Sequence, residues 1–466
     1  MFAVVLAVGL SISIAHASDE ISAPSSQLVS IESKGMLIPA CTLPGETRAD
    51  DVAPGHGSCV RASKDRWIIA YQTRSWRGVD DERSIVYQIR KDAPDGPVLK
   101  EGFLAQSIND WDPLHDGSKF VRQHGHPVIF GVPKGALIDG KPAPNANLFV
   151  VKWRIVAIPY DPVVKQIHRD KSSLFTKTQG VQWMQVRLND EGNDITIVQP
   201  VKPFRQKGFE TGDAICSAKP TVMNQTFVPA VAFDHACTQW ADVNHFAISG
   251  EIAPLKIAYN ATARLYEYVE TGPLAGGPKQ RLSECSLARF GGKWLIAARS
   301  GGVSFSLADD PFKDFPTPVP CPEIPTHSPL TVYTCADGVT RIFTGDGAAS
   351  PYKADRNPLY AWDITAMGNV LSFGSPKVVF DTFKAGLKFR KAVAPRVDFG
   401  TLFPPFGKTQ IVAYRVAPRA YNFPYDPPRK IPPLNAAEKP LCGCYYSVLT
   451  YRDVLPEPWT FATDNR

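Results

Sequence analysis

Two stretches decide the fold: Ser63-Lys64-Asp65-Arg66-Trp67-Ile68-Ile69-Ala70-Tyr71 and Phe290-Gly291-Gly292-Lys293-Trp294-Leu295-Ile296-Ala297-Ala298. In both, a turn leads to a Trp and then to a short apolar strand, and the two Trp residues align. Weaker copies follow the turns 336–338 and 407–408, and another includes 127–130. Self-similarity at a spacing of roughly 50 residues or more is typical of repeat architectures. Each unit combines a turn, a buried strand and a longer alternating strand, which predicts one blade of a β-propeller.

The repeat predicts an all-β fold, a β-propeller of about six four-stranded blades. Five or seven blades stay open, because the second unit is long enough to divide. The blades are expected at 57–106, 115–200, 205–272, 280–320, 328–382 and 392–460. The propeller domain is then 57–466, preceded by an N-terminal segment, 18–56. Residues 27–31 of that segment predict a lone strand that completes the last blade and closes the ring.

The first residues predict an exported protein. An apolar run over 2–15 leads to Ala15-His16-Ala17, the small-x-small pattern of a signal-peptide cleavage site, so we expect residues 1–17 to be removed. The alternative is an uncleaved anchor, but the run is too short to span a bilayer, so we expect a secreted or periplasmic protein with no membrane contact after cleavage. Some of the nine Cys are then expected to pair, with Cys41–Cys59 and Cys321–Cys335 as the local candidates.

The charge balance favours some partners over others. The net charge is +6 and the basic residues are scattered, which is mildly favourable to an acidic glycan. The sequence contains no basic helix, zinc-finger spacing or RNA-binding signature, so no nucleic-acid partner is expected. It also contains no serine-hydrolase elbow and no phosphate-binding Gly loop.

Residues 280–380 carry a resemblance to a known group of proteins. The segments that carry it are 284–294, 298–299, 306–312, 343–346 and 355–360. The blades that these segments predict resemble those of the sialidase-like and glycosidase β-propellers. The resemblance implies a propeller with carbohydrate chemistry. Sialic acid itself is not implied, because the Arg-Ile-Pro and Ser-x-Asp-x-Gly-x-x-Trp motifs of sialidases are absent from the sequence.

The first candidate site residues lie in two loops near the first blade. Residues 74–83 offer Arg74, Trp76, Arg77 and Asp80, which are the residue types that stack on a sugar ring and bind a carboxylate. The alternative is a charged, solvated loop. Residues 109–126 offer Asp112, His124 and His126.

In a regular strand the two His would share a face, which suits a general base or a pair of metal ligands. The alternative is one exposed and one structural His.

Further candidates come from later blades. Asp242, Asn244 and His245 alternate along one segment and are expected to line a sugar site, or else to form a buried polar network. Zinc's usual ligand spacing is not met there, so we expect no metal and no other cofactor. Glu210 is a further acid candidate. Arg299, Asp346 and Arg356 each follow or end an expected inner strand and are expected to converge on one mouth, or else to form salt bridges between blades.

Three functions fit these residues. The first is a glycoside hydrolase, with catalytic groups among Asp112, His126, Asp242 and Glu210 and a glycan held by the Arg, Trp and polar residues above. The second is a lyase acting on a uronic-acid polymer, in which a His takes the proton next to the carboxylate. The third is a non-catalytic propeller that binds sugar or protein, because the fold alone does not entail activity. We favour the hydrolase.

Overall fold

The computed structural model describes most of the chain. The described residues are 24–38, 52–75, 82–106, 108–111, 120–161, 166–167, 179–204, 226–230, 234–242, 251–277, 279–280, 282–324, 328–345, 356–367, 370–393, 395–418 and 434–462. They form six sheets of four or more strands, here numbered in chain order, and one small sheet of three strands. No α-helix occurs within these ranges, only the short 3₁₀ helices η2 (Lys391–Val393) and η3 (Lys439–Leu441).

Sheets 1 to 3 come from the first part of the chain. Sheet 1 consists of β2 (Val52–Arg61), β3 (Arg66–Ser75), β4 (Glu82–Lys91) and β5 (Val98–Ala105). Sheet 2 consists of β7 (Phe120–Val132), β10 (Leu148–Asp161), β12 (Gln179–Leu188) and β13 (Ile195–Pro203), with β6 (Ile108–Trp111) beside β7 and β11 (Gln166–Ile167) beside β10. Sheet 3 consists of β14 (Thr226–Ala230), β15 (Asp234–Asp242), β16 (Glu251–Asn260) and β17 (Leu265–Thr271), with β18 (Ala275–Gly276) beside β16.

The remaining sheets follow the same plan. Sheet 4 consists of β19 (Ser283–Phe290), β20 (Lys293–Arg299), β21 (Val303–Ala308) and β22 (Val319–Cys321). Sheet 5 consists of β23 (Leu330–Thr334), β24 (Thr340–Gly345), β25 (Leu359–Met367) and β26 (Val370–Phe373), with β27 (Lys377–Phe380) beside β25. Sheet 6 consists of β28 (Pro395–Leu402), β29 (Thr409–Pro418), β30 (Gly443–Tyr451) and β1 (Leu28–Ile38). The small sheet consists of β8 (Ala136–Ile138), β9 (Lys141–Pro142) and β31 (Thr460–Phe461).

Hydrophobic clusters join the sheets into a ring. Each cluster holds buried side chains from two neighbouring sheets, and one cluster joins sheet 6 back to sheet 1. Representative pairs, from the first interface to the last, are Ile68 with Phe149, Trp183 with Tyr266, Ile252 with Leu287, Phe305 with Ile342, Phe380 with Tyr414, and Ile411 with Trp67. Because such a ring leaves no open sheet face, the predicted all-β propeller is confirmed.

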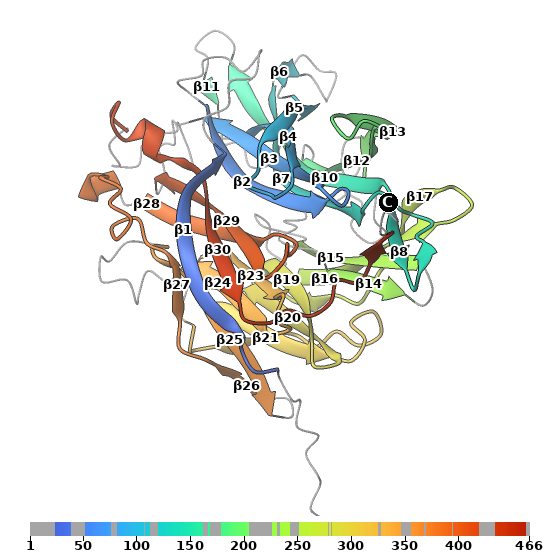
Figure 1. Ribbon diagram of the computed structural model, residues 1–466. Coiled ribbons are helices and arrows are strands. Elements are labelled where there is room, and N and C mark those ends of the chain that lie inside the picture. The colour runs from blue at the N-terminus through green and yellow to red at the C-terminus, as the bar shows by residue number, and fades with distance from the viewer. Residues whose placement is uncertain are drawn as a thin grey trace, which may run out of the picture.

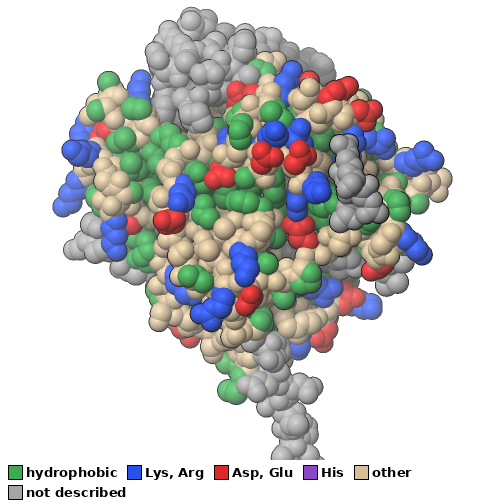
Figure 2. All heavy atoms as spheres, viewed as in Figure 1, with side chains coloured by type: hydrophobic (Ala, Val, Ile, Leu, Met, Phe, Trp, Pro, Cys, Tyr) green, Lys and Arg blue, Asp and Glu red, His purple; other side chains and the backbone are tan. Residues whose placement is uncertain are grey.

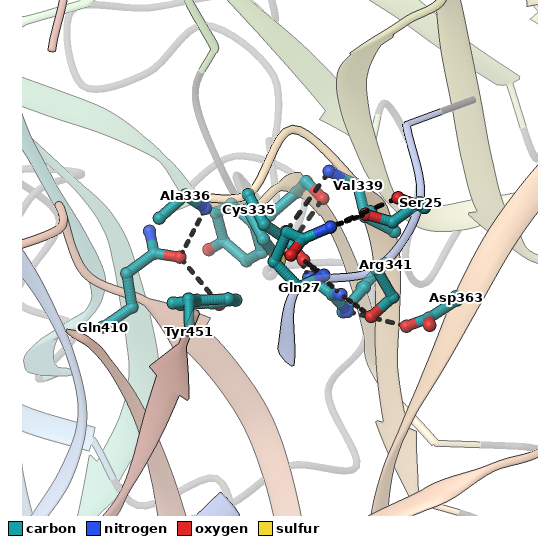
Figure 3. A network of polar contacts seen from close by, with 12 residues as sticks. Ser25, Gln27, Cys335, Ala336, Val339, Arg341, Asp363, Gln410 and Tyr451 are labelled. Atoms are coloured by element: carbon teal, nitrogen blue, oxygen red, sulfur yellow. Dashed lines mark hydrogen bonds and ion pairs between the residues drawn. The ribbon is translucent and has the colours of Figure 1, made fainter. Parts of the chain in front are cut away.

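The N-terminal strand closes the ring. β1 pairs antiparallel with β30, so the first described strand lies in the same sheet as the last strand of the six numbered sheets, as Figure 1 shows in blue and red. The residues just before β1 are fixed as well, because Ser26 Oγ accepts a hydrogen bond from Arg341 and the Gln27 N–H donates to Asp337 (Figure 3).

The repeat predicted from the two Trp residues is confirmed. Trp67 and Trp294 are both the second residue of the second strand in their sheets, and both are buried. Each pairs across the ladder with an Arg whose guanidinium lies over the indole, Arg61 in sheet 1 and Arg289 in sheet 4. The two units therefore share a packing motif as well as a pattern.

The predicted local disulfide between Cys321 and Cys335 is wrong. Both thiols are free: Cys321 ends β22 of sheet 4, whereas Cys335 follows β23 of sheet 5. Cys59 is also a free thiol, and its predicted partner, Cys41, lies outside the described residues. Side-chain packing, rather than a disulfide, therefore holds the chain at Cys321 and Cys335.

Candidate functional site

All six sheets present corresponding strand ends at one face of the ring. First strands of neighbouring sheets contact one another, namely β2 with β7, β14 with β19, β19 with β23, β23 with β28, and β28 with β2, so the first strands lie innermost. In each sheet the first strand begins, the second ends and the third begins at the same face. We call this face the top and the opposite face, with the first hairpin turn of each sheet, the bottom.

Three predicted site residues end second strands, and therefore lie at the top. Arg74 is next to the last residue of β3, and Ser75 beside it pairs with the first residue of β2. Asp242 is the last residue of β15. Arg299 is the last residue of β20 and pairs with the first residue of β19. These three residues come from sheets 1, 3 and 4.

His126 lies at an irregular point of β7. Gly125 pairs with Arg154 and Val128 with Lys152, so His126 and Pro127 form a β-bulge opposite one residue, Trp153. The His126 backbone is left-handed, with φ of 53°. Its N–H donates to the side-chain carbonyl of Gln72 in sheet 1 at 2.6 Å, and the side chain is 9% exposed.

His124 has the environment of a structural residue. It is 0% exposed, and its Nδ1 accepts a hydrogen bond from Trp153 Nε1 at 3.0 Å. Its Nε2 lies 3.0 Å from the Gln106 carbonyl, which can only accept, so Nε2 carries the proton and the ring is the neutral tautomer. Both nitrogens are thus engaged, which is the environment of the structural His that the sequence left open as the alternative.

Arg356 is held at the top between sheets 5 and 6. Its backbone is also left-handed, with φ of 70°, and its carbonyl accepts a hydrogen bond from the Val397 N–H of β28 at 2.8 Å. Asn357 beside it is buried and exchanges hydrogen bonds with Thr382. The pairing brings Arg356 next to the start of the innermost strand of sheet 6.

The left-handed backbone is itself informative. The non-Gly residues of this conformation in the described ranges are Asp92, His126, Asp139, Asn147, Arg264 and Arg356. Asn and Asp tolerate the conformation best, whereas it costs most other residues about 1–2 kcal/mol. Such strain clusters at functional sites when the surroundings hold it in place. His126 and Arg356 are the two that coincide with residues predicted from the sequence.

The other predicted site residues lie outside the described residues. They are Trp76, Arg77, Asp80, Asp112, Glu210, Asn244, His245 and Asp346. Their convergence on one mouth with His126 and Arg299 stays a prediction. Within the described ranges, no group of three or more His, Cys, Asp or Glu is arranged to hold a metal ion.

Two polar residues at this end of the ring were not identified from the sequence. Gln72 is 0% exposed, and its Nε2 has no hydrogen-bond partner among the described residues. Asp381 is 3% exposed, with Oδ1 fixed by the Phe383 and Lys384 N–H groups and Oδ2 without a described partner. A buried polar atom without a partner needs an explanation, such as a ligand or a water. No motif surrounds either residue, so sequence patterns gave no signal.

A charged pair stabilises the loops beside sheet 6. The Arg390 side chain donates to both oxygens of Glu438, at 2.9 and 2.7 Å, and its backbone N–H donates to the same carboxylate. The Arg390 guanidinium, helped by the backbone donors, lowers the pKa of Glu438 to about 2. On the face that Figure 2 shows, side chains of both charge signs are interspersed, with no extended patch of one sign.

Comparisons with known proteins find likeness in structure only. No family model matches the sequence, and no curated protein matches it. A protein of unknown function from Dyadobacter fermentans is similar, with a TM-score of 0.53 and 9% identity over 91% of this chain and 99% of that one. The NanB sialidase of Streptococcus pneumoniae has a TM-score of 0.49 and 7% identity over 92% of this chain and 71% of its own.

The α-L-arabinofuranosidase Arb93A of Fusarium graminearum has a TM-score of 0.45 and 10% identity over 92% and 99% of the two chains. A sialidase and an α-L-arabinofuranosidase are thus among the similar structures, in agreement with the resemblance drawn from the sequence. At these identities the likeness extends to nothing beyond the fold. No helix among the residues described is long and apolar enough to cross a membrane.

Proposed function

We propose that the protein is a carbohydrate-active β-propeller, a glycoside hydrolase that binds its glycan at the top of the ring. One observation carries the proposal. Residues chosen for sugar chemistry from the sequence come from five different sheets: Arg74, Asp242, Arg299 and Arg356 lie at or near strand ends on one face, and His126, within β7, is hydrogen-bonded to Gln72 near the same end of β3. Loops carried by a rigid scaffold are where binding and catalytic groups of such folds gather.

The roles follow from the chemistry of the residue types. An Arg binds a carboxylate or a sugar oxygen through parallel hydrogen bonds, so Arg299 and Arg356 are assigned to binding. Glycoside hydrolysis needs one carboxyl group to protonate the leaving oxygen and a second to attack or to activate water. Asp112, Asp242 and Glu210 are assigned to these steps, with His126 as a proton carrier.

A panel of polysaccharides and oligosaccharides tests the proposal. We expect new reducing ends without an ultraviolet-absorbing double bond. An absorbing product indicates the lyase instead, and glycan binding without any product indicates the non-catalytic propeller. Either result contradicts the proposed hydrolase.

Two substitutions test the assigned roles. Arg299→Ala should raise KM with little change in kcat, whereas His126→Asn should lower kcat, because proton transfer by a placed side chain typically contributes 10²–10⁴-fold. Arg187→Ala is the matched control, since Arg187 is an exposed arginine on β12. Loss of activity that only follows loss of thermal stability in both site variants contradicts the assigned roles.

Export is part of the proposal. It rests on the apolar run 2–15 and the Ala15-His16-Ala17 site. N-terminal sequencing of the protein recovered outside the cytoplasm should begin at Ser18. An intact leader on the exported chain contradicts the assignment.

A further inference from the structure

Two β-bulges face each other where sheets 1 and 2 meet. In β2, Pro54 pairs with Thr73 and Gly57 with Tyr71, so Gly55 and His56 together oppose Gln72. The second bulge is the one formed in β7 by His126 and Pro127. A bulge adds a residue to one strand and turns its side chains in a new direction, and bulges are frequent beside active sites.

Gln72 connects these two bulges. It lies in β3, and its side-chain carbonyl accepts the His126 N–H at 2.6 Å across the boundary between the sheets. Gly55 makes room for it, because a Cβ at Gly55 would lie 2.6 Å from Gln72 Cγ and 2.8 Å from its Nε2. Any other residue at position 55 would therefore displace the Gln72 side chain.

The backbone of His126 needs such support. Its φ of 53° is unfavourable for a residue with a Cβ, by about 1–2 kcal/mol. Pro127 adds a second constraint, because a residue before proline is driven to extended conformations. A strained conformation persists only when neighbouring groups determine it. The His126 N–H is fixed by its hydrogen bond to the Gln72 side chain.

We propose that Gln72 is a positioning residue: its side-chain carbonyl holds His126 in the left-handed bulge and so sets the direction of the imidazole at the top of the ring. The proposal rests on the proposed function for the part that concerns catalysis, since His126 is the proton carrier there. The hold on the backbone is a statement about geometry and can be measured without any substrate.

A second hydrogen bond between the same two sheets supplies the control. Ser58 Oγ of β2 accepts the Ile129 N–H of β7 at 3.2 Å. Ile129 pairs with Val151 in the regular part of the ladder, so this bond joins the sheets without supporting a bulge. Ser58→Ala removes an inter-sheet bond to the same strand and leaves the support of His126 in place.

The experiment compares Gln72→Met, Gln72→Glu and Ser58→Ala in the full chain. Met is close to Gln in shape but cannot accept the N–H, whereas Glu keeps an acceptor oxygen. With ¹⁵N-labelled histidine, the backbone amide signal of His126 is identified by its loss in His126→Asn. We expect this signal to move upfield in Gln72→Met, because the hydrogen bond is lost, and to stay near its original position in Gln72→Glu and Ser58→Ala.

Turnover of the glycan found in the panel gives the second readout. We expect Gln72→Met to lower kcat by about 10- to 100-fold with KM nearly unchanged, since a displaced catalytic group costs up to about 10²-fold. Gln72→Glu should restore most of kcat, and Ser58→Ala should leave kcat unchanged. Equal losses in Gln72→Met and Ser58→Ala overturn the positioning role.

The two readouts separate this inference from the proposed function. An unmoved His126 amide in Gln72→Met overturns the inference whether or not the protein acts on glycans. If no glycan is turned over, the proposed function fails. A moved amide then still supports the hold of Gln72 on the His126 backbone.

Discussion

Replacing Arg341 by Met should destabilise the ring at the point where the N-terminal residues join it. Arg341 is the second residue of β24, and its side chain is 0% exposed. It donates to both oxygens of Asp337, at 2.7 and 2.8 Å, and its Nε donates to Asp363 at 2.7 Å (Figure 3). A further bond, from Nη2, reaches Ser26 just before β1. One guanidinium therefore ties sheet 5 to the strand that closes sheet 6.

The size of the effect follows from burial. The Asp337 side chain is also 0% exposed, and in Arg341→Met its carboxylate would keep only the backbone donors of Gln27 and Val339. Removing one partner of a buried ion pair costs about 3–5 kcal/mol. With an unfolding entropy of about 2.1 cal/mol/K per residue, a chain of this length loses roughly 1 °C in Tm per kcal/mol. We therefore expect Tm to fall by about 3–5 °C.

Chemical denaturation of a small set of variants tests this reasoning. The set is Arg341→Met, Asp337→Leu, the double variant, and Arg187→Met as the exposed control. An apolar replacement of a whole buried pair is often nearly neutral, so the double variant should recover part of the loss. The reasoning is refuted if Arg341→Met costs no more than Arg187→Met, or if the losses of the two single variants simply add.

Three other predictions concern stability and thiol chemistry. The pKa of Glu438 is lowered to about 2, so the ionised carboxylate stabilises the fold above its ordinary pKa of 4.5, and this stabilisation is lost as the pH falls towards 2. In Glu438→Gln the free energy of unfolding should therefore depend less on pH between about 4.5 and 2. An unchanged slope in this range contradicts the prediction. Ser286 accepts the Val332 N–H between sheets 4 and 5 at 2.9 Å, so Ser286→Ala should cost about 1–3 kcal/mol in urea denaturation, and a neutral variant speaks against this bond. Burial, helped by a hydrogen bond to Glu323, raises the pKa of Cys321 to about 11, so its alkylation should be slow at neutral pH and accelerate towards pH 11; fast reaction at pH 7 rules this out.

The repeat was readable from the sequence because the same packing recurs. Trp67 and Trp294 stand two residues into the second strand of their blades and stack on a cross-strand Arg. In sheet 5 the equivalent position is Arg341, which is buried only because Asp337 and Asp363 pair with it. A pattern of apolar residues cannot show that a charged residue fills a core position. The copy of the repeat that follows the turn 336–338 therefore matches the pattern only weakly.

The geometry of the candidate site was harder to predict. Regular alternation would continue through His124 and His126, but a bulge interrupts the ladder at His126 and Pro127, and His124 is held by Trp153. Gly125 and Pro127, on either side of His126, are typical of an irregular strand, but they do not predict the position of the bulge. Gln72 carries no charge and belongs to no motif. Its role depends on a contact between two sheets that only the folded ring creates.

Substitutions at the top of the ring should change mainly activity, whereas substitutions at the bottom should change mainly stability. Each cluster between sheets buries many apolar side chains, and full burial of one such side chain is worth about 1.5–3 kcal/mol. About 1–2 kcal/mol of strain at His126 or Arg356 is no larger than the contribution of one such side chain, so the packing around them can hold both residues in unfavourable conformations. In His126→Gly the relieved strain should offset part of what the loss of the buried side chain costs, so activity should fall by more than the change in stability accounts for. Substitutions at Arg341 on the bottom should do the opposite, because that side chain joins the sheets and lies far along the strands from the site.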